Sequence, residues 1–337
     1  MNEHHSSTSL FLLEQLAQDL RKIAVRASQA AVEAIHRGNV ERLFNDPEVD
    51  ESDASLLVYD PHHAGAAPDR IDARAKEAAW AEWTAGCGRL GIEPRSMIAA
   101  GEEIGSGTRE IYKGNYLIRQ DSCDGTNNAR RLWDLFSSVQ LIDKVRSVDP
   151  LQPRARHLSG AITNNSGITV SWVHTSVFVR SRGRYLSIRG RVYLEGAPWG
   201  IPETELQGRR WDRAAGTVAA VAASPERRKK LQEVLDGLSL VPDALYTLGG
   251  TPLAPALIGG DLEMLIEPNA VSLHDSALLI PHQILGGVIT DLRLKPFDYL
   301  GEYERCALTL SPDDKPIEGY IAWGDAAAAL GQAGKVS

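Results

Sequence analysis

The sequence has few cysteines and no paired cysteine motif, which argues against two classes of protein. Its 337 residues include three cysteines, which lie far apart in the chain at Cys87, Cys123 and Cys306. An odd number without CxxC spacing disfavours a disulfide framework and a zinc ribbon, and it favours a reducing compartment. We therefore expect a cytoplasmic protein.

A surplus of basic residues and a long apolar run are also missing. The chain has 36 Lys and Arg against 44 Asp and Glu, a formal net charge of −8, whereas a nucleic-acid-binding domain usually carries a basic excess. An acidic chain is not drawn to anionic membranes either. The start, Met1–His5, has no positive charge, and Leu10–Leu13 is too short for a signal peptide or a membrane span. We expect no nucleic-acid or membrane partner.

The remaining composition and patterning are those of a soluble α/β protein. Hydrophobic residues make up 43% and charged residues 24% of the chain, close to globular averages, and the length fits two domains or one large α/β domain. Apolar spacing predicts helices over 8–38 and 72–90, and alternating β-branched residues predict strands between 160 and 194. Ser224 followed by proline predicts a helix start, and Gly237 its C-cap.

Three acidic segments suggest metal chemistry. They are Gly101–Glu103, Asp121–Thr126 after a short strand over 115–119, and His274–Asp275 ahead of an apolar run and Gly286–Gly287. Mg²⁺ prefers carboxylate and carbonyl oxygens and leaves positions for phosphate. Asp121 and Asp124 at the mouth of a strand can converge on one metal cluster, with the Cys123 carbonyl between them.

The end of the second segment suggests an anion site beside those metals. Gly125 allows a sharp turn, and a helix starting near Thr126 would aim free N–H groups and its positive dipole end at an anion. Each segment alone is most often an ordinary turn or cap, but the three in this order are much more specific. The pattern therefore predicts a phosphate held by metals in an acidic protein.

With these motifs the sequence resembles the inositol monophosphatase superfamily of Mg²⁺-dependent, lithium-sensitive phosphomonoesterases. Weaker similarity is found at 250–256 and 261–267. The resemblance extends from residue 70 to residue 300 but is poor between 160 and 241. It implies an α/β (α+β layered) fold, the alternating helix/sheet sandwich of the inositol monophosphatase and fructose-bisphosphatase type, and a homodimer. One domain would span 1–337, with N-terminal helices over 1–45, a metal- and phosphate-binding half over 46–150, and a C-terminal half with the substrate-facing region over 151–330.

The resemblance also implies a role for each matching residue. Glu102 and Thr126 would orient and activate a metal-bound water, with Asp121 also in the catalytic set, and the amides of Gly125 and Thr126 would hold the phosphate. Glu267 would contact substrate hydroxyls. Two or three Mg²⁺ ions would be held by a larger set, formed by Glu102, Asp121, the Cys123 carbonyl, Asp124, Asp275 and the early acidic residue Asp72.

The chain departs from the family pattern at three positions. Ser122 stands where the family usually has proline. The loss of this rigid residue loosens the loop without removing a ligand. His274 stands where the family usually has tryptophan; it either packs beside the metal loop or contacts substrate and relays a proton. A threonine that often accompanies the early acidic residue is absent near Asp72, which affects the outer metal position.

Several other groups have two interpretations. Arg130 and Arg131 either form a solvated helix face or reach a second anion, and the arginines between Arg180 and Arg191 form an exposed strand face, an anion funnel or a protomer contact. A nucleophilic role for the Cys123 thiol is disfavoured because the family uses the carbonyl there. The sequence contains no Ser-His-Asp pattern and no GxxxxGK phosphate loop.

The sequence thus predicts a Mg²⁺-dependent phosphatase, a phosphomonoester hydrolase of a small phosphorylated polyol, sugar or nucleotide. Water attack would need no covalent enzyme nucleophile. The alternative is a non-hydrolytic descendant of the fold, either a ligand-binding protein or an enzyme that uses the metal pocket for another reaction. The retained acidic set, from Glu102 to Asp275, favours the hydrolase.

Overall fold

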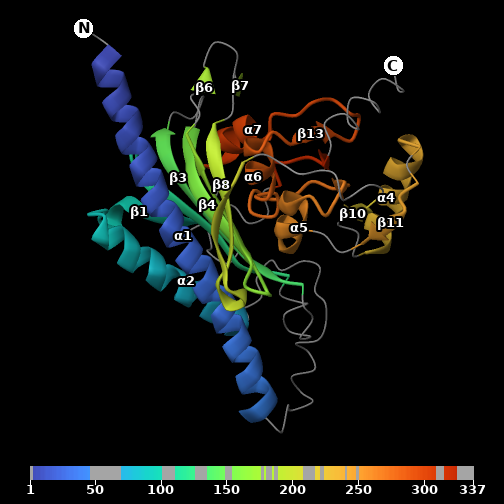
Figure 1. The fold of residues 1–337 in the computed structure, drawn as a ribbon, viewed down its shortest axis with the longest axis horizontal. Coiled ribbons are helices and arrows are strands. Elements are labelled where there is room, and N and C mark those ends of the chain that lie inside the picture. The colour runs from blue at the N-terminus through green and yellow to red at the C-terminus, as the bar shows by residue number, and fades with distance from the viewer. Residues whose placement is uncertain are drawn as a thin grey trace.

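The computed structural model places two β-sheets between three layers of helices (Figure 1). The described residues are 3–45, 70–100, 111–125, 135–148, 154–175, 178–179, 184–185, 189–207, 217–220, 224–239, 241–247, 250–308 and 315–324. From left to right in Figure 1, the layers are α1 with α2, the larger sheet, α5 to α7, the smaller sheet, and α4. This arrangement confirms the predicted layered α/β sandwich.

The larger sheet has the order β1-β2-β3-β4-β5-β8-β9 within the described ranges. β1 and β2 are parallel, and the other neighbours are antiparallel. The strands are β1 (Met97–Ala100), β2 (Tyr116–Asp124), β3 (Ser137–Ser147), β4 (Arg154–Asn164), β5 (Thr169–His174), β8 (Gly190–Gly196) and β9 (Ile201–Leu206), with β6 (Phe178–Val179) and β7 (Arg184–Tyr185) pairing separately.

The smaller sheet has the order β11-β10-β12-β14-β13. β10 pairs in parallel with both β11 and β12, whereas β14 is antiparallel to β12 and β13. The strands are β10 (Thr217–Ala220), β11 (Ala244–Tyr246), β12 (Met264–Glu267), β13 (Val288–Asp291) and β14 (Tyr320–Trp323). The helices around it are α4 (Pro225–Gly237), α5 (Ala254–Gly259), α6 (Leu279–Ile284) and α7 (Tyr299–Cys306), with a short 3-10 turn η5 (Thr251–Leu253) before α5.

Two long helices cover the outer face of the larger sheet. α1 (Glu3–Asn45) is one continuous helix where one or two were predicted over 8–38, and α2 (Arg70–Arg89) agrees with the prediction over 72–90. Buried Trp83 of α2 donates from Nε1 to Gln140 Oε1 at 2.9 Å. The guanidinium of Arg21, 1% exposed, donates to Ser171 Oγ and to Glu203 Oε2, both at 2.9 Å. Polar bonds as well as apolar packing therefore attach these helices to the sheet.

Two local predictions differ from the structure. β2 continues to Asp124, so the acidic segment is the end of the strand rather than a loop after a strand over 115–119. α4 has the predicted serine cap, since Ser224 Oγ accepts from Arg227 N at 3.2 Å. The glycine cap was wrong: Gly237 is the last helical residue, Leu238 is the C-cap, and the positive φ of +52° falls on Ser239.

The predicted strands between 160 and 194 are confirmed in β4, β5 and β8, and the Gly286–Gly287 turn leads into β13. The predicted helix near Thr126 and the arginines Arg130 and Arg131 lie outside the described residues. Among the helices of the described ranges, none combines the length and apolar character that a membrane crossing requires.

Candidate metal centre

The end of β2 carries two carboxylates on either side of an irregularity in the strand pairing. The β2–β3 register shifts between Asp121 and Asp124, and such an irregularity redirects the side chains around it. Asp121 is 7% exposed, and its Oδ1 accepts from the Cys123 amide at 3.1 Å. This bond fixes one oxygen of Asp121 against the backbone of its own strand.

Gly125 makes the turn that follows the strand. Its φ is +90°, and a Cβ there would lie 2.7 Å from the carbonyl oxygen of Leu135. Both the left-handed backbone and the close approach require glycine. The sharp turn predicted at this position is therefore present, and it closes β2 against the start of β3.

A second segment, the turn over 272–278 before α6, brings His274 and Asp275 to the same place. The Asp275 amide donates to Ser272 Oγ at 3.2 Å, and Ser276 Oγ donates to the Ser272 carbonyl at 2.7 Å. Tyr299 of α7 donates its hydroxyl to Ser276 Oγ at 2.9 Å. The helical middle layer thus holds this turn firmly.

The two segments meet in a cluster of three possible metal ligands. One ligand atom from each of Asp121, His274 and Asp275 lies within 4.8 Å of the others. His274 Nε2 is 4.0 Å from Asp121 Oδ2 and 3.7 Å from Asp275 Oδ1. These separations are longer than hydrogen bonds. The chemistry of the set, two carboxylates and an imidazole, suits a divalent cation.

Asp124 lies beside this cluster and is held by Thr251. Asp124 Oδ2 accepts from the Thr251 amide at 3.2 Å and from its hydroxyl, which also pairs with Ser137 Oγ at 2.7 Å. Burial and then the charge of Asp275 raise the pKa of Asp124 to about 6, while the bonds from Thr251 act in the opposite direction. A carboxylate whose pKa is raised in this way is stabilised in its charged form by a nearby cation.

Thr251 is a residue of the site to which sequence reasoning gave no role. The signal was present in the weaker similarity over 250–256, but its partner Asp124 is 127 positions away in the chain. Gly250, with φ of +99°, turns the backbone so that the Thr251 amide and hydroxyl face the same carboxylate oxygen.

Glu267 lies at the end of β12 and is electrostatically linked to the cluster. It is 2% exposed, and its Oε1 accepts from the Asn269 amide at 2.9 Å. Burial raises the pKa of Glu267 to about 7; the Asn269 bond and Arg227 lower it, and the charge of Asp275 raises it further. The predicted substrate-contacting acid is thus within electrostatic range of the predicted metal ligands.

Other predicted site residues are not brought into this cluster. Asp72 is buried in the first turn of α2 and is not part of the group formed by Asp121, His274 and Asp275. Glu102 and Thr126 lie outside the described residues. The assignments of these three residues stay predictions.

Part of the arginine cluster and Ser122 lie among the described residues. Arg191 forms an ion pair with Glu14 of α1, so it ties β8 to the outer helix, while Arg189 is exposed. Arg180 and Arg182 lie outside the described residues. Ser122 is 1% exposed, and its hydroxyl has no hydrogen-bond partner among the described residues.

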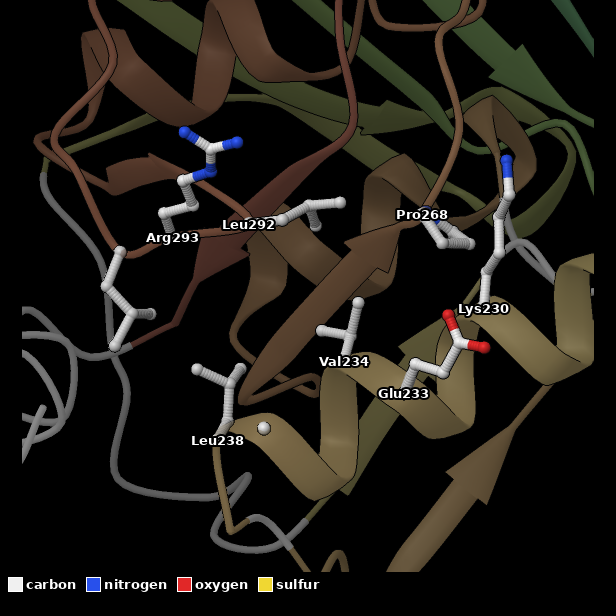
Figure 2. Close-up of a pocket in the computed structure, with 9 residues that line it drawn as sticks. Lys230, Glu233, Val234, Leu238, Pro268, Leu292 and Arg293 are labelled. Atoms are coloured by element: carbon white, nitrogen blue, oxygen red, sulfur yellow. The ribbon is translucent and has the colours of Figure 1, made fainter.

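A separate cavity of about 500 Å³ lies between α4 and the hairpin after β13. Figure 2 shows Val234, Leu238 and Leu292 on its apolar walls, with Lys230 and Arg293 at its edges. No residue of the metal cluster lines it. The cavity is therefore distinct from the acidic centre.

Comparison with known proteins rests on structure. No protein-family model and no curated protein sequence matches the chain. Among solved structures, the extragenic suppressor protein SuhB of Bartonella henselae has a TM-score of 0.53 and 11% identity over 94% of this chain and 97% of that protein. SuhB of Mycobacterium tuberculosis has a TM-score of 0.52 and 13% identity, covering 94% and 96%.

Inositol monophosphatase II of Staphylococcus aureus has a TM-score of 0.50 and 12% identity, covering 93% of this chain and 94% of that protein. The match extends over nearly the whole length of each protein, so it includes both sheets and the three helical layers. The sequence motifs had predicted this architecture from a few acidic segments. The chain has the fold of the inositol monophosphatase superfamily.

Proposed function

We propose that this protein is a divalent-cation-dependent phosphomonoester hydrolase of the inositol monophosphatase superfamily. The observation that carries the proposal is the convergence of Asp121 and Asp124 with His274 and Asp275, from segments far apart in the chain, at one point of this fold. Mg²⁺ is the ion that the carboxylates and the resemblance favour. The substrate class is a small phosphorylated polyol, sugar or nucleotide.

The donor set fits such ions. Asp121, Asp124 and Asp275 concentrate negative charge at one place. The pKa of Asp124 is raised by its burial and by the charge of Asp275. We propose that these three carboxylates hold two or three ions. The sequence resemblance adds Glu102, Asp72 and the Cys123 carbonyl to this set of ligands. Divalent ions bound there would lower the pKa of water and neutralise charge on a phosphate ester.

The remaining residues would position the substrate. Thr251 holds Asp124 in one orientation through two bonds to the same oxygen. Gly125 and Thr126 would donate their amides to the phosphate, and Glu267 would accept a hydrogen bond from a substrate hydroxyl. The Glu267 carboxyl, with a pKa raised to about 7 by burial, suits a neutral polyol rather than a second anion.

The test is release of inorganic phosphate from a panel of phosphomonoesters, with and without Mg²⁺ and Li⁺. We expect Mg²⁺-dependent release that Li⁺ inhibits, and loss of release in Asp121→Asn. The matched control is Asp236→Asn on the exposed surface of α4, where the carboxylate accepts from Gln232, and it should keep wild-type activity. Trapping of a phosphorylated residue would contradict direct attack by water.

The alternative is a non-hydrolytic descendant of the fold. It would be supported if no ester in the panel gave Mg²⁺-dependent release while Asp121→Asn still weakened the binding of a phosphorylated ligand. A homodimer and a cytoplasmic location stay predictions, and sedimentation of the purified chain tests the former.

A further inference from the structure

The metal cluster contains one side chain that the family resemblance does not account for. His274 occupies a position where tryptophan, which cannot ligate a metal, is usual in the family. Its side chain is 6% exposed, and Nε2 faces an oxygen of Asp121 and an oxygen of Asp275. We propose that His274 Nε2 is a metal ligand, and that with Asp121 and Asp275 it forms a mixed site that prefers Mn²⁺, Co²⁺ or Zn²⁺ to Mg²⁺.

The separations fit ligands of one ion better than direct bonds between side chains. Two atoms that each lie about 2.0–2.2 Å from one metal can be no more than about 4.4 Å apart. The nitrogen-to-oxygen separations of 4.0 Å and 3.7 Å fall within this limit. A hydrogen bond would require about 2.7–3.2 Å. The two separations that involve His274 therefore match donors that share an ion, and all three donors lie within 4.8 Å of one another.

The local structure holds each donor in place. The Cys123 amide donates to Asp121 Oδ1, and Asp121 Oδ2 lies 4.0 Å from His274 Nε2. The Ala277 amide donates to the His274 carbonyl at 3.1 Å, and Ser272 Oγ accepts from the Asp275 amide at 3.2 Å. The donors are thus presented by two braced turns, which reduces the reorganisation that binding would need.

The donor set determines which ions the site prefers. Mg²⁺ favours oxygen ligands and near-ideal octahedral geometry, whereas imidazole suits Zn²⁺ and other transition metals and carboxylate suits Mn²⁺. A nitrogen at this position therefore shifts selectivity toward transition metals. The competing interpretation is an imidazolium that acts as a counter-ion for the two carboxylates. It predicts the opposite result, because a His274 nitrogen that keeps its proton makes no bond to a metal, and loss of the imidazole would then not lower the affinity for Co²⁺ or Zn²⁺.

This inference deepens the proposed function at the same site, but it can be measured without substrate. Metal-free, full-length protein is titrated with Mg²⁺, Mn²⁺, Co²⁺ and Zn²⁺ by calorimetry, and Co²⁺ binding is followed by visible absorption. In His274→Gln an amide group replaces the ring nitrogen at a similar reach. We expect affinity for Co²⁺ and Zn²⁺ to fall about tenfold or more, affinity for Mg²⁺ to change less than about threefold, and the Co²⁺ absorption to shift.

The matched control is His36→Gln, since His36 is an exposed residue of α1 that bonds the Asn165 carbonyl and is not one of the three clustered residues. It should leave every titration unchanged. If His274→Gln does not fold, nitrogen NMR of the wild type decides, because Zn²⁺ should shift the Nε2 resonance of His274 directly.

Unchanged Co²⁺ affinity and absorption in folded His274→Gln would overturn the inference, as would wild-type protein that binds none of the four ions. The two proposals fail separately. If Co²⁺ binds through His274 but no phosphate is released, the inference about His274 holds and the proposed hydrolase function is wrong. If Mg²⁺-dependent release occurs but Co²⁺ binding does not depend on His274, the hydrolase function holds and the inference is wrong.

Discussion

Among the described residues, two groups that combine carboxylates with histidines are built in opposite ways. In the first, which we call the closed network, Asp143 Oδ1 accepts from His157 Nδ1 at 2.7 Å and Oδ2 accepts from the Tyr303 hydroxyl at 2.9 Å. Trp172 Nε1 donates to His157 Nε2 at 2.8 Å. Because indole only donates, His157 carries its proton on Nδ1 and every polar atom of the imidazole is used.

The second group is the metal centre, where the separations are wider. His274 Nε2 lies 4.0 Å and 3.7 Å from oxygens of Asp121 and Asp275, and the charge of Asp275 helps raise the pKa of Asp124 to about 6. Buried polar groups stabilise a fold when their bonds are made within the protein. The closed network fits a structural role, and the metal centre has the spacing and the charge of a group completed by a ligand.

The largest expected effect is on the metal centre. Asp121→Asn should lower metal affinity and phosphate release by more than about a hundredfold, because even outer partners of metal ligands contribute about 10–100-fold. Calorimetry and the phosphate assay measure the two losses. A variant that lost activity but kept wild-type metal affinity would place the metal elsewhere.

The same substitution in the closed network should affect stability instead. Asp143→Asn replaces one acceptor oxygen with a donor that faces either His157 or Tyr303, so one buried bond is lost. We expect the free energy of unfolding to fall by about 1–3 kcal/mol, measured by urea denaturation, with metal affinity unchanged. An unaffected unfolding midpoint would mean that the network does not stabilise the fold.

Asp275→Asn should change stability in the opposite direction when metal is absent. It removes a negative charge that raises the pKa of Asp124 and of Glu267. Removal of such repulsion at functional sites commonly gives about 0.5–2 kcal/mol of stability; we expect the lower end, because 39% of the Asp275 side chain is exposed. Destabilisation of the metal-free protein would show that Asp275 makes a net favourable contribution to the fold.

A further expected effect is a pH dependence of metal binding. Burial and the charge of Asp275 raise the pKa of Asp124 to about 6, so below that pH the carboxyl holds a proton that must leave when a cation binds. Apparent affinity should therefore rise from pH 5 to pH 7, by up to about tenfold per unit, and then level off. Titration with Mn²⁺ in buffers of different ionisation enthalpy measures the released proton, and Asp124→Asn should abolish this step.

Local chemistry explains which parts could be predicted from the sequence. Asp121 and Asp124 lie within one short segment with Gly125, and His274 adjoins Asp275, so each half of the centre was visible as a motif. The layered fold followed from the resemblance that these motifs carry. Element positions followed from periodicity, although the left-handed residue after α4 is Ser239 and not the expected glycine.

Long-range contacts explain the rest. Thr251 bonds Asp124 across 127 positions, and the closed network joins β3, β4 and α7, since Tyr303 and Asp143 are 160 positions apart. Arg191 was expected on an exposed strand face, in an anion funnel or at a protomer contact, and it pairs with Glu14 of α1. No local pattern specifies such partners, because packing between layers brings them together.

Thermal unfolding in chelator and in saturating Mn²⁺ tests the central claim, that the acidic cluster is completed by a divalent cation, most directly. An ion that binds only the folded state at about a hundred times its dissociation constant adds about 2.7 kcal/mol of stability. The wild-type protein should therefore unfold at a higher temperature with Mn²⁺, and Asp121→Asn should not respond. Equal unfolding temperatures of the wild type in both conditions would contradict the claim.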